Sequence, residues 1–235
     1  MIPFLLVAHS LLASPAPSPC LGLAGYPAGS TWTYAGTRLW SEANSRADSG
    51  AVEWTMSLLR TRTVPAAHLL LVRGFVSELA WSTPGTSPRL SILACRSDRL
   101  FHLEFSTDSG ATYALDHWTD SLLNGAKLIL QEPLRDGAVF GQEPPRDDRM
   151  YGWTIEKVDP APALPKSCRA SAPEVYRLTM RTLPDQQILE WRAGIGVTAF
   201  HFAHHGTPAA ADVRLVRCRS LAPSNTPRPL PARPQ

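Results

Sequence analysis

Residues 190–207 read EWRAGIGVTAFHFAHHGT, and this stretch decides how the second half of the chain is interpreted. Apolar and polar residues alternate over 197–205, which predicts a β-strand because successive side chains of a strand point to opposite faces. The G-x-G step predicts a bend or bulge of the backbone. The Gly-Thr-Pro that follows predicts a turn. His204 and His205 are then at the tip of a hairpin that returns through ADVRLVRC at 211–218.

The same period of two recurs along the chain. AVEWTMSLLR at 51–60 places four apolar side chains on one face: Val52, Trp54, Met56 and Leu58. MYGWTIEKV at 150–158 and EVYRLTMRT at 174–182 alternate in the same way. In RLFHLEF at 99–105 we expect Phe101, Leu103 and Phe105 on the buried face, opposite His102 and Glu104.

Turn sequences rich in Gly, Pro, Asp and Ser, such as TDSG at 107–110, separate these runs. The spacing of the runs predicts roughly nine to eleven strands. We therefore predict a mainly β fold, an antiparallel curved sheet that forms a half-barrel or barrel with at most one or two short helices. HLLLVRGF at 68–75 and LSILAC at 90–95 are more continuously apolar and are expected to lie deeper. DHWTDSLLNG at 116–125 carries the helical pattern, with Gly125 as its stop.

Composition limits the classes of function. The chain has 235 residues, 44% of them hydrophobic, so it can bury a sizeable core. Its net charge of +3 comes from basic residues spread along the chain. A nucleic-acid partner is not expected, because no polybasic arm or basic aromatic signature is present.

The two ends of the sequence differ from its middle. Residues 1–24 begin with MIPFLLVAHSLLASPA, an apolar run followed by small residues, which predicts a secretory signal and an exported, periplasmic or extracellular protein. The run is too short and too interrupted by proline to be a transmembrane segment. Proline immediately before Cys20 argues against lipid anchoring there. We predict one β domain over 25–220 and a disordered, Pro-rich tail over 221–235.

The four cysteines form no C-x-x-C pair, which argues against a zinc ribbon or a thioredoxin-type motif. A disulfide is expected in an exported protein. Cys95 and Cys218 are the favoured pair because both lie on predicted strands, and buried free thiols are the alternative.

Standard catalytic signatures, from the G-x-S-x-G elbow to the Walker loop, are absent from the sequence, and no cofactor is predicted. His201, His204 and His205 are the candidate metal ligands. On one strand, residues four apart are separated by about 13 Å, too far for both to bind one metal ion. The hairpin tip is the preferred interpretation. The D-H-x-x-D run of Asp116, His117 and Asp120 is a second, weaker cluster.

Aromatic residues suggest a ligand site. We expect Trp54, Tyr151, Trp153 and Trp191 to line the concave face of the curved sheet, where aromatic side chains bind apolar or amphipathic ligands. The same residues also fit a filled core, and the sequence leaves both interpretations open.

Three landmarks occur in a fixed order: YPAGSTWTY at 26–34, EPLRDGAVFG before MYGWTIEKV at 132–158, and the closing stretch at 190–207. This order resembles a broad group of uncharacterised exported bacterial proteins. The resemblance implies an envelope-located, mostly antiparallel β protein, similar to the half-barrels of lipoprotein carriers. At 191–194 the chain has WRAG where the group has a Tyr-Ala-Pro-Gly-like sequence. The group brings no established catalytic residues.

Three hypotheses of function follow. The first is a non-catalytic exported protein that binds a lipid, another hydrophobic small molecule or an envelope protein on its aromatic face. The second is a structural or interaction module without a ligand. The third is a metal-dependent hydrolase that uses the three histidines.

Overall fold

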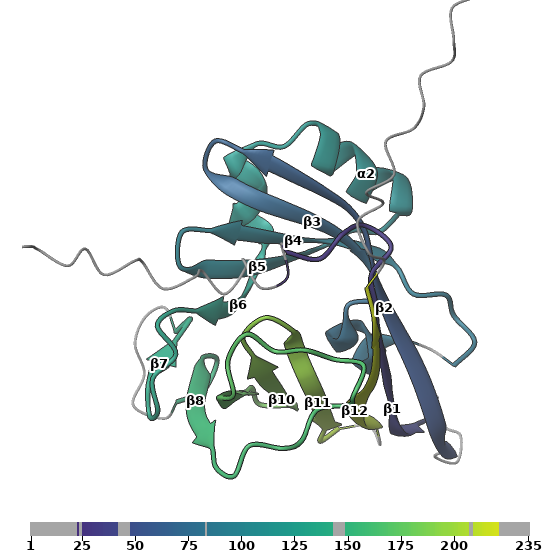
Figure 1. Ribbon diagram of the computed structural model, residues 1–235. Coiled ribbons are helices and arrows are strands. Elements are labelled where there is room, and N and C mark those ends of the chain that lie inside the picture. The colour runs from purple at the N-terminus through teal and green to yellow at the C-terminus, as the bar shows by residue number, and fades with distance from the viewer. Residues whose placement is uncertain are drawn as a thin grey trace, which may run out of the picture.

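The computed structural model describes residues 23, 25–41, 48–82, 84–142, 149–206 and 209–220 (Figure 1). The predicted signal segment falls almost entirely outside these ranges, and the predicted Pro-rich tail falls wholly outside them. Within the described ranges the fold is mainly β, a twelve-stranded antiparallel sheet that curves into a nearly closed barrel. The strands are β1 (Thr31–Trp40), β2 (Asp48–Val64), β3 (Ala67–Arg73), β4 (Leu90–Arg96), β5 (Arg99–Glu104), β6 (Lys127–Gln131), β7 (Val139–Phe140), β8 (Trp153–Val158), β9 (Val175–Arg181), β10 (Asp185–Arg192), β11 (Gly196–His204) and β12 (Ala209–Arg219).

Strand order explains the shape of the barrel. The sheet runs β6-β5-β4-β3-β2-β1-β12-β11-β10-β9-β8-β7, so the first and last strands of the chain pair at its centre. The two edge strands, β6 and β7, are neighbours in the sequence and meet where the sheet would close (Figure 1). We call this junction the seam. The predicted class is confirmed, and the strand count exceeds the prediction because the seam adds a strand of only two residues.

The run at 51–60 confirms the alternation argument. Trp54, Met56 and Leu58 are buried and belong to the main core inside the barrel. Strands β3 and β4 are buried on both faces, as their continuously apolar sequences predict. A second apolar cluster lies on their outer face, beneath α2 (Asp108–Asp116) and the 3-10 helix η2 (Asp120–Gly125). Figure 1 shows α2 lying over this part of the sheet.

Helix α2 occupies the position of a predicted turn. The sequence TDSG was expected to be a turn, but Thr107 is the N-cap of α2, and its side chain accepts a hydrogen bond from the Gly110 backbone N–H at 3.1 Å. The same residue types favour turns and helix starts, because a short polar side chain can bond a backbone N–H in both. The predicted stop at Gly125 is confirmed, since η2 ends there.

Strand β5 corrects one prediction. His102 and Glu104 share the face of Leu100, which belongs to the core inside the barrel, while Leu103 packs in the cluster beneath α2. The predicted polar face of 99–105 therefore points into the barrel. Alternation gives the two faces of a strand but does not say which is interior when both are covered.

The stretch that begins at Glu190 contains the turns of two consecutive hairpins. Strand β11 ends at His204, His205 and Gly206 lie in a turn, and the chain returns as β12, so the predicted hairpin tip is confirmed. The G-x-G step makes the β10–β11 turn, where both glycines have positive φ, +83° at Gly194 and +90° at Gly196. A Cβ atom on Gly194 would lie 2.6 Å from the Ser171 backbone nitrogen, so this turn requires glycine for space as well as for conformation.

The predicted disulfide is wrong in one partner. Cys218 bonds Cys168, with Cα atoms 5.0 Å apart, and not Cys95. Three strands separate Cys95 on β4 from Cys218 on β12 in the sheet. Cys168 lies in the long loop between β8 and β9, where strand periodicity gives no signal. Cys95 is itself disulfide-bonded, so the free-thiol alternative is also wrong.

Candidate functional site

The inner face of the barrel is apolar at one end and polar at the other. Along β10 the side chains that point inward are Trp191, Leu189, Gln187 and Asp185, in that order. The same change occurs on β5, where Leu100 is followed on the inner face by His102 and Glu104. We call the polar end, where β3, β5, β9 and β11 finish, the mouth.

A buried carboxyl group sits at the mouth. The 3-10 helix η1 (Val76–Trp81) follows β3, and Val76 and Leu79 anchor it in the core. Glu78, on the same helix, is only 8% exposed. Its Oε1 lies 3.9 Å from Nε2 of His102, whose ring packs on Phe75 with centroids 4.7 Å apart. The other ring nitrogen of His102, Nδ1, is 3.7 Å from Oε1 of Glu104. The imidazole thus lies between two carboxyl groups at distances too long for hydrogen bonds.

Burial changes the proton affinity of these groups. Desolvation raises the pKa of Glu78 from 4.5 to about 7, and the Ser91 hydroxyl and the backbone of Arg89, which lie close to the carboxyl group without reaching full hydrogen-bonding geometry, partly offset it. Desolvation lowers the pKa of His102 from 6.5 to about 4, so this fully buried ring is neutral. Burial, the largest single effect, favours a higher pKa for Glu104, but the 2.7 Å hydrogen bond from Lys127 and the electrostatic effects of His102, Lys127 and Arg89 together outweigh it and leave the pKa below its ordinary value.

Most of these buried polar atoms lack a hydrogen bond. Among the described residues, neither carboxyl oxygen of Glu78, neither ring nitrogen of His102, nor the Ser91 hydroxyl has a partner in hydrogen-bonding geometry. Unpartnered buried polar atoms are uncommon, since each costs about 1–3 kcal/mol, and they occur often at functional sites.

The seam beside this cluster is closed by a side chain. The indole N–H of Trp153 on β8 donates to the Leu128 carbonyl oxygen on β6 at 2.8 Å. Phe140 on β7 stacks on the Trp153 ring, with centroids 6.4 Å apart. Backbone pairing is absent between β6 and β7 in the described sheet, so this indole bond links β6 to β8, the strand next to the short edge strand β7, across the seam.

A pocket of about 360 Å³ opens at the seam. Leu128, Ile129, Trp153 and Met180 form its apolar wall. Its polar wall comes from the mouth: Ser77, Glu104, Lys127, Asp185 and Gln187. Three of the residues that line the pocket are neighbours in the sheet, because Trp153 on β8 pairs with Met180 on β9, which pairs with Gln187 on β10. The seam pocket therefore has an apolar side and a charged side.

The four aromatic residues predicted to line a ligand site are not together. Tyr151 and Trp153 both line the seam pocket, Tyr151 at its exposed rim with 45% of its surface accessible. Trp191 is 1% exposed in the core. Trp54 is also buried, and its indole N–H donates to the Gly74 carbonyl oxygen at 2.9 Å.

The three candidate metal-ligating histidines are also separated. His201 and His204 lie three residues apart on β11 and so point to opposite faces. His204 Nδ1 is 2.6 Å from Asp185 Oδ1, and His205 lies in the turn. No group of three or more His, Cys, Asp or Glu side chains in the described part of the chain is arranged to hold a metal ion.

The second predicted cluster is distributed among separate surface contacts. Asp116 forms an ion pair with Arg60 at 2.8 Å, Asp120 forms one with Arg96 at 3.1 Å, and His117 stacks on Tyr113.

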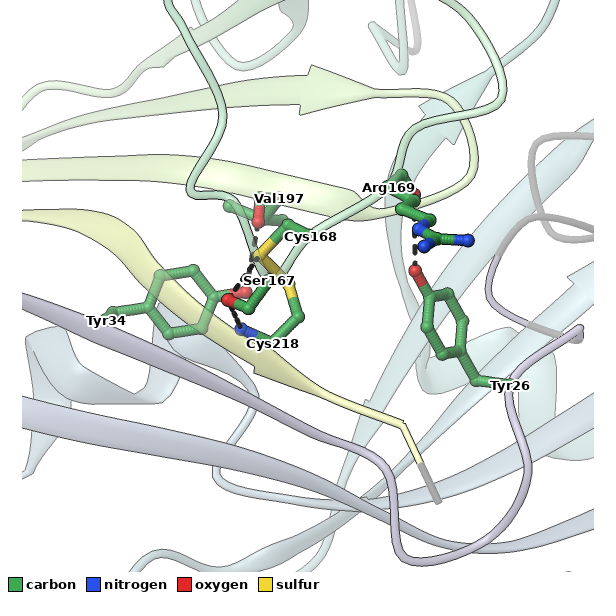
Figure 2. Close-up of a disulfide and its surroundings, with 7 residues drawn as sticks. All are labelled: Tyr26, Tyr34, Ser167, Cys168, Arg169, Val197 and Cys218. Atoms are coloured by element: carbon green, nitrogen blue, oxygen red, sulfur yellow. Dashed lines mark hydrogen bonds between the residues drawn. A yellow bond between two sulfur atoms is a disulfide. The ribbon is translucent and has the colours of Figure 1, made fainter. Parts of the chain in front are cut away.

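At the end of the barrel opposite the mouth, the loop between β8 and β9 is joined to β12 by the Cys168–Cys218 disulfide (Figure 2). Beside the disulfide, the Cys218 backbone N–H donates a hydrogen bond to Ser167 Oγ at 3.1 Å. Within the barrel at this end, the Tyr34 hydroxyl donates to the Val197 carbonyl oxygen at 3.0 Å, and burial raises the pKa of Tyr34 above its ordinary value. Among the described residues, the open and polar end of the barrel interior is therefore the mouth.

Sequence reasoning missed the charged members of this site. Glu104 and His102 were placed on the wrong face, and Glu78 and Lys127 were not considered. A signal existed for Glu78, which is the acidic residue in the mostly apolar stretch GFVSELAW at 74–81.

Comparison with known proteins adds little. No protein-family model matches the chain, and no curated protein sequence matches it. A presumed exported protein with a YmcC-like fold from Bacteroides fragilis, known from a crystal structure, is similar over 83% of this chain and 97% of its own, with a TM-score of 0.36 and 10% sequence identity. None of the described helices is long and apolar enough to cross a membrane.

Proposed function

We propose that the protein is a non-catalytic binding protein that holds an amphipathic small molecule in the seam pocket. The observation that supports this most directly is the division of the pocket into an apolar wall, with Trp153 and Met180, and a charged wall, with Lys127 and Asp185. Its volume of about 360 Å³ is within the range typical of small-molecule sites. An apolar chain would lie against the first wall while a polar head group faces the second.

The seam itself supports entry of a ligand. Elsewhere in the barrel, neighbouring strands are joined by backbone ladders, which open only at a large cost in hydrogen bonds. At the seam, the described part of the chain joins β6 to β8 through the indole hydrogen bond of Trp153 and through apolar contacts. Opening the barrel there costs least, so we propose the seam as the route into the pocket.

We propose that the protein works outside the cytoplasm. The signal-like sequence of residues 1–24 supports this location. The Cys168–Cys218 disulfide supports it independently, because disulfides persist mainly in oxidising compartments.

A fluorescent probe tests the binding function. Prodan, an uncharged amphipathic dye, shifts its emission to the blue when it enters an apolar site. We expect saturable binding to the wild-type protein and a loss of affinity of about tenfold or more in Met180→Glu, which places a charge on the apolar wall. Thr179→Glu is the matched control, because it adds the same charge to the neighbouring residue, which faces the outer groove beside Glu156 and Arg181.

Equal affinity of the two variants would contradict the assignment to the seam pocket. Absence of saturable binding to the wild-type protein, together with no co-purifying small molecule in native mass spectrometry, would favour an interaction module without a ligand.

A further inference from the structure

A second cleft lies on the other side of Glu104, between η1 and the chain that leads into β4. Its volume is about 110 Å³, and Ser82, Ser87, Arg89 and Phe105 line it together with the two carboxyl groups of Glu78 and Glu104. Glu104 lines the seam pocket as well, so the two cavities are adjacent and share this residue, while the other residues that line them differ.

Two carboxyl groups, of Glu78 and Glu104, line this cleft beside the guanidinium of Arg89 and the hydroxyls of Ser82, Thr86 and Ser87. Carboxylate oxygens only accept hydrogen bonds, and the formal charges of Glu78, Glu104 and Arg89 leave an excess of one negative charge. The nearest basic group on the inner face, Lys127, is already engaged by Glu104 at 2.7 Å. The imidazole of His102 is neutral and supplies no charge.

Glu78 is the independent indication of a ligand. The residue is more than nine-tenths buried and lines the cleft, and neither of its carboxyl oxygens has a partner in hydrogen-bonding geometry among the described residues. The Ser91 hydroxyl and the backbone of Arg89 and Phe75 lie close enough to favour the charged form without completing a hydrogen bond. A ligand that donates hydrogen bonds and carries positive charge would satisfy these oxygens and balance the charge together. A neutral ligand would satisfy the oxygens without balancing the charge, and an anion would do neither of these.

We propose that this cleft is a second binding site, that it takes a small primary amine in its protonated form, and that the Glu78 carboxylate is the acceptor of the ammonium group. The small volume limits the ligand to a few non-hydrogen atoms beyond the nitrogen or to the end of an alkylamine chain. The proposal is separate from the proposed function of the seam pocket.

The test uses three ligands of the same size and different charge. n-Butylammonium, n-butanol and butyrate are titrated into the isotopically labelled full chain at pH 7.5, and binding is followed by the amide chemical shifts of Ser82, Ser87 and Leu90. We expect saturable shifts with n-butylammonium, with a dissociation constant on the order of 1 mM. The alcohol and the carboxylate are expected to bind at least about tenfold more weakly.

Glu78→Gln is the deciding variant, because it keeps the shape of the side chain and removes its charge. We expect it to reduce the affinity for n-butylammonium by about tenfold or more while prodan still binds in the seam pocket. Glu53→Gln is the control, since Glu53 is an exposed carboxylate on β2 whose ion-pair contact with Arg217 is 3.9 Å long.

Affinity should also depend on pH. Glu78 binds a proton as the pH falls below about 7, so binding of the amine should weaken between pH 7.5 and 6 in the wild type. The charged groups near Glu78 are Glu104, Arg89 and Lys127, and Glu104, whose pKa lies below its ordinary value, stays ionised over this interval. Equal binding of the alcohol and the amine, or full retention of amine binding in Glu78→Gln, would overturn the proposal. Failure of the Met180→Glu experiment would leave it intact.

Discussion

Glu78→Gln is expected to change how stability depends on pH, and the magnitude follows from the structure. The carboxyl group of Glu78 titrates at about 7 in the folded protein and at its ordinary value of 4.5 in the unfolded chain. Between these values the folded state holds a proton that the unfolded state has released, so the free energy of unfolding falls as the pH rises. At about 1.4 kcal/mol per pH unit, the full loss is about 3 kcal/mol, complete above pH 7.

His102 has the opposite effect. Its imidazole titrates at about 4 when folded and at 6.5 when unfolded. Between these values the unfolded state binds a proton that the folded state does not, so stability rises with pH and the gain is complete above pH 6.5. In the wild-type protein the two slopes nearly cancel between pH 4.5 and 6.5. Glu78→Gln removes the fall of the free energy of unfolding with pH and leaves the rise that comes from His102.

The assay is urea denaturation of the wild type and of Glu78→Gln at several values of pH from 4.5 to 7.5. Stability of the variant relative to the wild type should increase by about 3 kcal/mol over this interval. Other titrating groups, including Glu132, whose pKa is also raised to about 7, are common to both proteins and cancel in the difference. Glu53→Gln is the control, and its difference from the wild type should be flat. A pH-independent difference for Glu78→Gln would refute the reasoning.

Three further variants test the rest of the fold. Replacing both cysteines of the Cys168–Cys218 bond by serine should lower the free energy of unfolding by about 4 kcal/mol, the loop-closure value for a sequence separation of 50 residues. Chemical denaturation measures this loss, and a loss below about 1 kcal/mol would contradict a stabilising role of the disulfide. Trp153→Phe removes the seam hydrogen bond, which should lower the free energy of unfolding by about 1 kcal/mol and speed amide hydrogen exchange in β6. Trp54→Phe loses a similar bond away from the seam and should leave amide exchange in β6 unchanged. Glu190→Gln should lower the free energy of unfolding, measured by heat or denaturant, by about 2 kcal/mol, because the buried carboxylate accepts hydrogen bonds from two arginines on the outer face. The same change at the exposed Glu156 should lower it by less than about 0.5 kcal/mol, and equal losses would contradict the role of burial.

Much of the fold could be predicted because its signals are local. Alternation over 51–60 and the turn after His205 identified strands and a hairpin tip that the structure confirms. Strand β7 was beyond such reasoning, since a strand of two residues has no period. Helix α2 was missed for another reason: Thr107, Asp108 and Ser109 favour a turn and a helix start equally, and the apolar surface beneath the helix selects between them.

The site could be predicted only in part, because it depends on contacts between distant segments. Tyr151 and Trp153 were selected as aromatic residues in phase with a strand; both line the seam pocket, and their role in ligand binding stays a prediction. The charged wall comes from β5, β6 and β10, which the curvature of the sheet brings together across the seam. The inward direction of Glu104 was hidden because the opposite face of β5 is covered by its own apolar cluster.

The distribution of stabilising and destabilising features along the barrel axis is itself an argument for function at the mouth. The end opposite the mouth carries the disulfide, the buried Tyr34 hydrogen bond and fully buried Trp191. The mouth carries Glu78 and His102, whose unpartnered atoms reduce stability. If Glu78→Gln is more stable than the wild type above pH 7 and also loses amine binding, the cost of burying this carboxyl group is explained by the ligand it accepts. A variant that gains stability and keeps amine binding would instead show that the barrel tolerates the buried group without using it.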